Sequence, residues 1–517
     1  MTGSSPRKRI AVVGAGPGGL TAAMLLAKHG YQVTVYERKA NVGGRNGALR
    51  LDGFTFDIGP TFLLMNSFLR QAFHMTGRRL EDYLQLKPID PFYRLSYADG
   101  REFFPTHDRA AMREQIERLF PGQSPGYERF MSDEATKAAR LNDVIRLPYG
   151  SLAAIFRPQV LAALPYLDAH RSLWGYLGRY FRHRDLRAAF TFQAKYLGMS
   201  PWRAPATYSM LSFMEHHEGI FHPIGGLNAI SEAMAKVVRE EGGELRLATP
   251  VRRLRIEGRR AVGVELESGE FVPADRVVLN ADFAHAMHHL VAPEHLSRWH
   301  PKRIKRKGFS CSTFMLYLGV DRTYDVPHHG IFFSGDYEKN VREVASAKSP
   351  SEDPSFYVHN PSRIDPTLAP AGQSALYILV PVPNNRSGIR WDEEGPRYRE
   401  KLLTLLETRA QLTDLRKHIV VERMLTPADW ASEMCVHEGA TFNLAHNFGQ
   451  MLCWRPHNEF EDIDDCYLVG GGTHPGSGLP TIYESGRISA MLLAARDGIT
   501  IPPPPAYKLA ETRAGGI

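Results

Sequence analysis

Apolar runs broken by glycine predict a strand–helix–strand unit at the beginning of the chain. Residues 9–14 (RIAVVG) are apolar and rich in β-branched side chains, which is typical of a buried strand in a parallel sheet. Residues 20–28 have the apolar content of a compact helix, and Gly30 closes it. Residues 32–37 (QVTVYE) predict a second strand, so this segment predicts one βαβ unit.

The same kinds of pattern return far along the chain. Residues 225–241 predict an amphipathic helix, strands dominate between 310 and 385, and residues 466–472 (CYLVGGG) predict a strand that breaks into glycines before a helix at 480–497. Residues 147–219 have a helical pattern rich in aromatic side chains. One discontinuous α/β domain, with a second domain threaded through it, explains this order better than three consecutive domains.

We therefore expect a Rossmann-like α/β domain, discontinuous in sequence, with an inserted mixed β-sheet and a helical region. Residues 1–85, 223–300 and 460–500 would form the cofactor domain, and residues 86–145 and 301–459 the substrate-binding sheet domain. Residues 146–222 would form a helical region that associates with a membrane, and the proline-rich residues 501–517 a flexible tail.

Three glycines and one acid at the first predicted turn indicate a dinucleotide site. In the Gly14-x-Gly16-x-x-Gly19 motif, the glycines allow a tight turn, a close approach of the backbone to a pyrophosphate, and close packing of helix on strand. The helix that follows directs free N–H groups at the phosphates. Glu37 ends the second strand, where a carboxylate accepts the ribose hydroxyls.

Two further glycine-rich segments favour FAD over NAD as that dinucleotide. Gly43-Gly44-Arg45 follows Glu37 closely and gives Arg45 a position from which to bind a phosphate. Residues 467–480 (YLVGGGTHPGSGLP) place a glycine-rich turn before a helix whose first turn contains Pro480. Such a turn offers N–H groups to the pyrimidine edge of a flavin, where negative charge collects on reduction.

From about residue 8 to 497 the chain resembles the bacterial carotenoid (phytoene) desaturase family, within the FAD-dependent amine oxidase/phytoene desaturase superfamily. The resemblance rests on the glycine motif, ERxxxxGGR, GFTFDIGPT, PFYRL, the helix from Gly225, LNAD, WRPHN and LVGGGTHPGSGLP, in that order. It implies FAD contacts at Gly14, Gly16, Gly18, Gly19, Glu37, Arg38, Gly44, Arg45, Val251 (through its backbone, to the adenine), Asp282, Gly472, Gly478, Leu479, Pro480 and Ile482.

The resemblance implies an FAD-dependent desaturase that introduces double bonds into an acyclic C30 or C40 polyene. A hydride would pass to the flavin and a proton to water or Glu215, and oxygen or a quinone would reoxidise the flavin. One departure leaves the exact reaction open: many family members have small residues where this chain has Tyr483 and Glu484. The alternatives are an oxygenase or ketolase of the terminal methyl group, an amine oxidase, and a non-catalytic carotenoid carrier, against which the intact glycines argue.

Polar clusters elsewhere invite other interpretations. Glu215-His216-His217-Glu218, with His222, has the composition of a metal site, but adjacent residues point in different directions, so we predict no metal site. Glu215 remains a candidate for catalysis beside the flavin. His474, in the glycine-rich turn, is a candidate for proton transfer, although a structural hydrogen bond is the favoured role.

Composition bounds the partners and the location. Lys and Arg exceed Asp and Glu by seven, a mild excess without a nucleic-acid recognition motif, so we expect no nucleic-acid partner. The four cysteines are scattered, which favours reduced thiols in the cytoplasm. No signal peptide or membrane-spanning stretch is expected. The apolar residues 151–181 are either core or a patch that enters a membrane interface, and the basic residues 302–307 are either a solvated loop or a contact for anionic lipid. A lipophilic polyene substrate favours membrane contact, and the resemblance then implies peripheral association with the inner membrane of a bacterium.

Overall fold

The computed structural model describes residues 7–505, without the side chains of residues 195–197. The predicted flexible tail therefore lies outside the described residues from residue 506 onward. A five-stranded parallel sheet forms the centre of the cofactor half, in the order β19-β13-β1-β2-β9. Its strands are β1 (Arg9–Val13), β2 (Gln32–Tyr36), β9 (Glu244–Arg246), β13 (Arg276–Leu279) and β19 (Cys466–Leu468).

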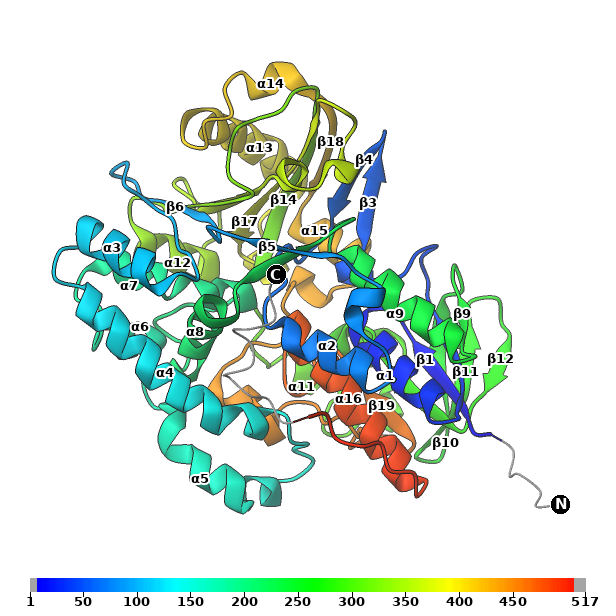
Figure 1. Cartoon of the computed structure of the whole chain (residues 1–517). Helices are drawn as coiled ribbons and strands as arrows, with labels where there is room; N and C mark the ends of the chain where they lie inside the picture. Colours follow the sequence, from blue (N-terminus) through cyan, green and yellow to red (C-terminus); the bar gives the residue numbers. More distant parts are fainter. Residues whose placement is uncertain (1–6, 506–517) are drawn as a thin grey trace.

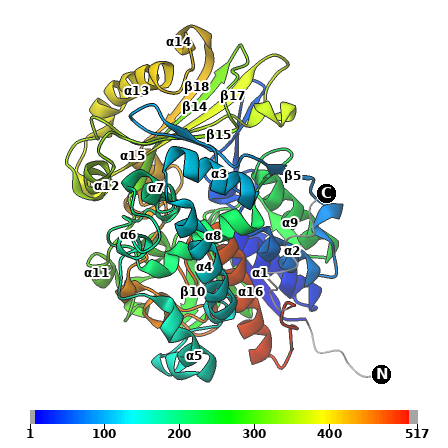
Figure 2. The ribbon, with the colours of Figure 1, turned by 60° about the vertical axis from the view of Figure 1, so that its left-hand side comes forward.

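The alternation of side chains along β1 explains why this sheet is covered on both faces. Ile10 and Val12 pack into one apolar cluster with the neighbouring helices, whereas Ala11 and Val13 pack into another. The helices on the first face are α1 (Pro17–Lys28), α2 (Asn66–His74), α9 (Asn228–Glu240) and α16 (Leu479–Arg496), which lie side by side (Figures 1 and 2). The second face carries β10 (Val251–Glu257), β11 (Arg260–Leu266), β12 (Phe271–Pro273), α10 (Phe283–His289) and α11 (Pro301–Ile304).

A seven-stranded mixed sheet forms the second half, in the order β18-β14-β17-β16-β15-β6-β7. Only β15 and β6 pair in parallel among these strands. Along β14, Phe314 and Leu316 pack against the helices α13 and α14, whereas Met315 and Tyr317 face the interior of the molecule. The elements are β6 (Arg94–Ser96), β7 (Glu102–Phe103), β14 (Ser312–Val320), β15 (His329–Phe332), α12 (Tyr337–Ser346), β16 (Phe356–His359), β17 (Ser374–Val382), α13 (Trp391–Thr408), α14 (Leu415–His418), β18 (Ile419–Leu425) and α15 (Pro427–Ser432).

Helices and two small sheets complete the molecule. The helices are α3 (Arg109–Leu119), α4 (Ser124–Ile145), α5 (Pro158–Leu167), α6 (Leu173–Leu177), α7 (Arg184–Ala189) and α8 (Ser209–Glu218). The small sheets pair β3 (Ala48–Leu51) with β4 (Phe54–Asp57), and β5 (Leu86–Ile89) with β8 (Ile220–Pro223). Helix α5 lies at the opposite end of the molecule from α14 (Figures 1 and 2). Among the described residues, no helix is long and apolar enough to cross a membrane.

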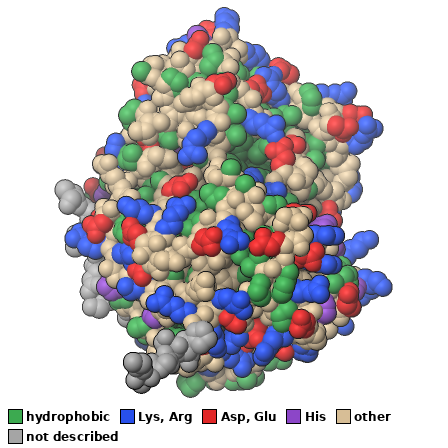
Figure 3. Space-filling view, turned by 90° about the vertical axis from the view of Figure 1, so that its right-hand side faces the viewer, with side chains coloured by type: hydrophobic (Ala, Val, Ile, Leu, Met, Phe, Trp, Pro, Cys, Tyr) green, Lys and Arg blue, Asp and Glu red, His purple; other side chains and the backbone are tan. Residues whose placement is uncertain are grey.

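The predicted fold class is confirmed: a parallel α/β sheet, assembled from the beginning, middle and end of the chain, carries an inserted mixed sheet. The exact domain boundaries stay a prediction. The sequence pattern did not indicate β8, a short strand at the end of the expected helical region that pairs with β5. On the face drawn in Figure 3, basic and acidic side chains are interspersed rather than gathered into separate patches.

Candidate functional site

One cavity of about 1360 Å³ lies between the two sheets and extends from the glycine motif to the inner face of the mixed sheet. Its charged lining residues all come from the cofactor half: Glu37, Arg38, Lys39, Arg45, Arg252, Glu267 and Asp282. The remaining wall is largely apolar and aromatic, and includes Phe62, Leu64, Met210, Leu379, Trp430 and Val436. The cavity therefore has a polar end and a long apolar end.

The glycine motif forms the turn between β1 and α1 at the polar end. Gly14 has φ +98°, and a Cβ there would lie 2.9 Å from the carbonyl oxygen of Asn280. Gly16 caps α1 without a side-chain hydrogen bond, and the first turn of the helix holds no acid. The first N–H groups of α1 therefore have no partner of their own, which makes the helix end a site for an anion.

Glu37 lies at the end of β2, where it lines the cavity. Its carboxylate accepts hydrogen bonds from the backbone N–H groups of Ala15 (2.8 Å) and Lys39 (2.9 Å), which fix its orientation. The buried carboxylate is thus placed beside the glycine turn, in the position that a ribose requires. Arg38 also lines the cavity, but it is exposed and donates to the backbone carbonyl of Glu433.

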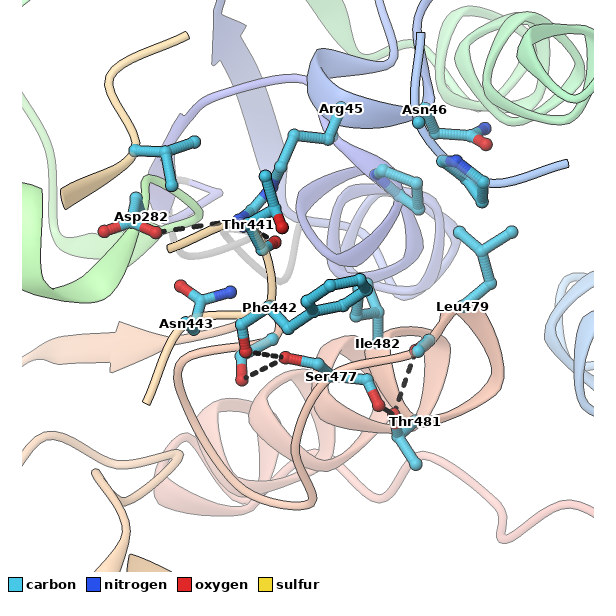
Figure 4. Close-up of a pocket in the computed structure, with 18 of the residues that line it drawn as sticks. Arg45, Asn46, Asp282, Thr441, Phe442, Asn443, Ser477, Leu479, Thr481 and Ile482 are labelled. Carbon is cyan, nitrogen blue, oxygen red and sulfur yellow. Dashed lines mark hydrogen bonds and ion pairs between the residues drawn. The ribbon is translucent and has the colours of Figure 1, made fainter. Parts of the chain in front are cut away.

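Arg45, Asp282 and Asn443 form a polar network on one wall of the cavity (Figure 4). Arg45 Nη1 lies 3.7 Å from Asp282 Oδ2 and donates to the carbonyl oxygen of Thr441 (2.9 Å). With its amide oriented to suit both neighbours, Asn443 donates to Asp282 Oδ2 (2.6 Å) and accepts from Arg45 Nη2 (3.1 Å). Burial raises the pKa of Asp282 above its ordinary value, against the attraction of Arg45.

A second helix end meets the cavity opposite the first. Gly478, with φ +112°, caps α16 without a side-chain hydrogen bond, and Pro480 occupies the first turn. Gly478, Leu479, Pro480 and Ile482 all line the cavity, as does Val251 on the other side of the polar end. The Ser477 hydroxyl holds the turn by donating to the carbonyl oxygen of Phe442 (2.6 Å) (Figure 4).

Three of the expected contact residues support the turns from behind instead of lining the cavity. A Cβ on Gly19 would lie 2.5 Å from the carbonyl oxygen of Gly14, so this glycine allows α1 to pack on β1. A Cβ on Gly18 would lie 3.1 Å from the backbone nitrogen of Gly470, and one on Gly472 would lie 2.5 Å from Phe283 Cβ. Direct cofactor contact by these three glycines, as by the other expected residues, stays a prediction.

The two candidate catalytic residues also lie behind the cavity wall. His474 is buried, packs edge-on against Tyr149 at 4.9 Å between ring centroids, and is not among the lining residues. Burial lowers its pKa to about 3, so the imidazole is neutral and suited to a structural role. Glu215 is fully buried and accepts a hydrogen bond from the hydroxyl of Tyr93.

Glu215 is held in its protonated form near neutral pH. Burial raises its pKa to about 8, although hydrogen bonds from Tyr93 and Gln193 act in the opposite direction. Because the pKa of Glu215 is higher in the folded protein than its ordinary value of 4.5, the free energy of unfolding falls as pH rises from 4.5 to about 8. Near pH 8, the cost of burying the ionised Glu215 carboxylate therefore lowers the stability of the folded protein.

A Glu215→Gln variant is accordingly expected to be more stable than the parent protein at pH 8 by about 3 kcal/mol. The amide mimics the protonated acid and still accepts from Tyr93, so the difference should shrink toward pH 5. Urea unfolding at both pH values measures it, with exposed Glu114→Gln as the matched control. An equal response of the two variants at pH 8 would contradict the assignment.

Tyr483 and Glu484, where the sequence departs from the resemblance, do not line the cavity. Tyr483 is buried in α16. Glu484 accepts from Arg146 Nε and Nη2 (both 3.0 Å) and from Arg487 Nε (2.8 Å), in a buried three-residue network. Glu484 therefore links α16 to the end of α4. Other residues determine the shape of the cavity.

Two asparagines that sequence reasoning missed are central to the site. Asn280 Nδ2 donates to the carbonyl oxygen of Gly14 (3.1 Å) and closes the glycine turn, and Asn443 joins the Arg45–Asp282 pair. Asn280 stood within a motif already noted, LNAD, which was a usable signal. Asn443 lies in an irregular segment and carried no local signal.

Comparison with known proteins agrees with this geometry. The family model described as flavin containing amine oxidoreductase matches residues 17–494. The chain is 50% identical to a 4,4'-diapophytoene desaturase (4,4'-diapolycopene-forming) of Methylomonas sp, over 95% of this chain and 96% of that one. It is 39% identical to a zeta-carotene-forming phytoene desaturase of Myxococcus xanthus, over 97% and 98%.

Among solved structures, wild-type putrescine oxidase bound to putrescine has the same fold. The TM-score is 0.59 at 16% identity, over 95% of this chain and 99% of that one. At this identity the likeness concerns the fold alone. The full-length matches in sequence decide the family: the chain belongs to the flavin-containing amine oxidoreductases, among which these two curated relatives are carotenoid desaturases.

Proposed function

We propose that this protein is an FAD-dependent desaturase that introduces double bonds into an acyclic C30 or C40 carotenoid. The observation that carries the proposal is the cavity itself, which joins a dinucleotide cradle to an apolar chamber without interruption. Among the described residues, no charged side chain other than those of the cofactor half lines it. A long uncharged polyene fits such a wall, whereas a polar amine would lose its hydration there without replacement.

The polar end fits FAD. Glu37 would accept the ribose hydroxyls, and the N–H groups at the beginning of α1 would bind the pyrophosphate, with Arg45 nearby. The beginning of α16 would face the flavin ring, where its N–H groups favour negative charge. FAD, when bound, supplies a hydride acceptor, and oxygen or a quinone would reoxidise it.

The protein's own residues have a limited chemical task in this reaction. The apolar wall excludes water and holds the saturated carbon–carbon bond of the substrate in place. The conjugated chain of the substrate spreads the developing charge, so a modest base such as water suffices to take the proton. Glu215 does not line the cavity and is mostly protonated at neutral pH, which favours water over Glu215 in this role.

Some of the apolar residues that line the cavity, Leu164, Phe448 and Trp454, are also exposed to solvent. Phe156 is 70% exposed and Phe448 65%, and both lie beside lining residues: Ile155 and Leu164 on one side, Met451 and Trp454 on the other. Apolar surface gathered in this way is typical of contact with a membrane. We propose that this apolar rim (Phe156, Leu161, Leu164, Phe448 and Trp454) enters the membrane interface and admits the polyene.

The rim can be tested by a double substitution. A Phe156→Ser/Phe448→Ser variant is expected to bind lipid vesicles at least about tenfold more weakly, because each phenylalanine contributes about 2 kcal/mol when buried. Vesicle sedimentation at a series of lipid concentrations measures the change. Phe271→Ser on β12, which is 48% exposed and outside the cavity lining, is the control. Equal binding of the parent and the double variant would place the membrane contact elsewhere.

Anaerobic turnover tests the function. The FAD-loaded protein is mixed with liposomes that contain either phytoene or 4,4'-diapophytoene, and flavin absorbance and product mass are followed. Bleaching of the flavin, with a product lighter by pairs of hydrogens, supports the desaturase and identifies the chain length. If neither substrate bleaches the flavin and a desaturated polyene instead gains oxygen in air, the protein is a terminal-methyl oxygenase and the desaturase proposal fails.

A further inference from the structure

A cluster of buried histidines lies outside the cavity, where the mixed sheet meets the small sheet of β5 and β8. His222 lies in β8, His328 directly precedes β15, and His359 ends β16. All three are buried, with exposed fractions of 0%, 5% and 1%. One ring nitrogen from each lies within 4.8 Å of the others.

Five of the six ring nitrogens of these three histidines lack a hydrogen-bond partner among the residues that the structure describes. Both nitrogens of His328, both of His359 and Nδ1 of His222 are buried without a partner. A buried polar atom without a partner costs free energy, and five of them in one place need an explanation. A neutral imidazole offers the lone pair of one ring nitrogen to a cation.

A carboxylate behind His222 orients it for binding. His222 Nε2 lies 3.0 Å from Asp365 Oδ2, which leaves Nδ1 directed away from Asp365. Asp365 is fully buried and is itself held by the N–H of Gly225 (2.7 Å) and the hydroxyl of Thr367 (2.6 Å). This carboxylate–histidine pair is the arrangement that fixes histidine ligands of metals.

We propose that His222 Nδ1, His328 and His359 bind one divalent first-row transition cation, for which Zn²⁺ is the best match. Imidazole nitrogens suit this class of ion, and three of them leave a fourth position for water. Tetrahedral Zn–N bonds place ligand nitrogens about 3.4 Å apart, so each ring needs to move by less than about 1 Å. Asp365 contributes the negative charge next to the site.

The proposal revises the prediction that the chain has no metal site. That prediction weighed His222 only together with residues 215–218, its neighbours in sequence. His222 instead meets two histidines more than 100 positions away, through strand pairing that the local pattern did not reveal. The ion would join β8, which leads into α9 of the cofactor half, to the beginning of β15 and the end of β16 in the mixed sheet.

Metal content of the full-length protein, purified without metal-affinity resin, tests the site. After incubation with Zn²⁺ and gel filtration, the parent protein is expected to retain about one equivalent by mass spectrometry. His328→Gln and His359→Gln should each retain less than about a tenth of that, while His216→Gln, another buried histidine outside the cluster, retains it all. Co²⁺ in place of Zn²⁺ should give the visible absorption of a four-coordinate site in the parent protein.

Thermal unfolding provides a second readout, since a chelator should lower the Tm of the parent protein and leave that of His359→Gln unchanged. Flavin content of each variant reports whether it has folded. The proposal is overturned if the parent retains less than about a tenth of an equivalent of Zn²⁺ and shows no Co²⁺ absorption. It is also overturned if folded His328→Gln and His359→Gln retain as much metal as the parent.

Discussion

A Glu484→Ala variant is expected to be less stable to unfolding than the parent protein by about 3–5 kcal/mol. The carboxylate lies between Arg146 and Arg487 and accepts hydrogen bonds from both guanidinium groups. Truncation leaves these two positive charges facing each other in a buried site, where neither water nor another acid replaces the lost partner. Among the described residues, the Arg146 guanidinium keeps its hydrogen bond to Gln71 and its stacking on Phe68.

The denaturation midpoint in urea measures this loss. Glu459→Ala is the matched control, because Glu459 pairs with the exposed Arg496 of the same helix at 2.6 Å and should matter by less than about 1 kcal/mol. A similar loss in both variants would show that burial of the Glu484 network contributes nothing. A large loss for Glu484→Ala alone would establish that the helical region depends on α16 for its position.

A Gly16→Val variant is expected to purify without FAD, with an affinity for the cofactor lower by at least about a hundredfold. Its Cβ would lie 2.8 Å from Asn280 Nδ2, and the branched side chain would fill the space in which the backbone of the turn approaches the pyrophosphate. It would also cover the N–H groups at the beginning of α1.

Flavin absorbance per protein and titration with FAD measure the effect. Gly150→Val is the control, since a Cβ at the exposed Gly150 would meet no atom within 4 Å. Circular dichroism must show that Gly16→Val is folded. A folded Gly16→Val variant that binds FAD as tightly as Gly150→Val would place the pyrophosphate elsewhere in the cavity.

The parts of the site that the sequence could predict are those carried by short segments. Gly14, Gly16 and Glu37 lie within one βαβ unit, so local pattern alone placed them around one turn. The beginning of α16 was predicted for the same reason, because Gly478 and Pro480 are adjacent to the helix that they start. Continuous apolar runs also indicated β1, β2 and β19 of the parallel sheet, and a strand-rich stretch was expected between residues 310 and 385.

What the sequence could not show depends on distant segments. Asn443 reaches Asp282 and Arg45 from an irregular segment of the second half, and no periodicity marks such a contact. His222 meets His328 and His359 only because the beginning of β15 and the end of β16 lie next to each other in the mixed sheet. Glu484 suggested a change in the reaction, but its partner Arg146, over 300 positions away, shows a role in packing.

The position of β19 in the parallel sheet bears on how the chain is made. β1 leaves the ribosome long before β13, which pairs with it and begins only at residue 276, and β19 completes that edge only at residue 466. At ordinary rates of synthesis this takes roughly 20–90 s, during which the apolar strands lack their neighbours. The cofactor site, which also needs α16, can therefore form only after residue 496 has been made, so the nascent protein depends on protection from aggregation until then.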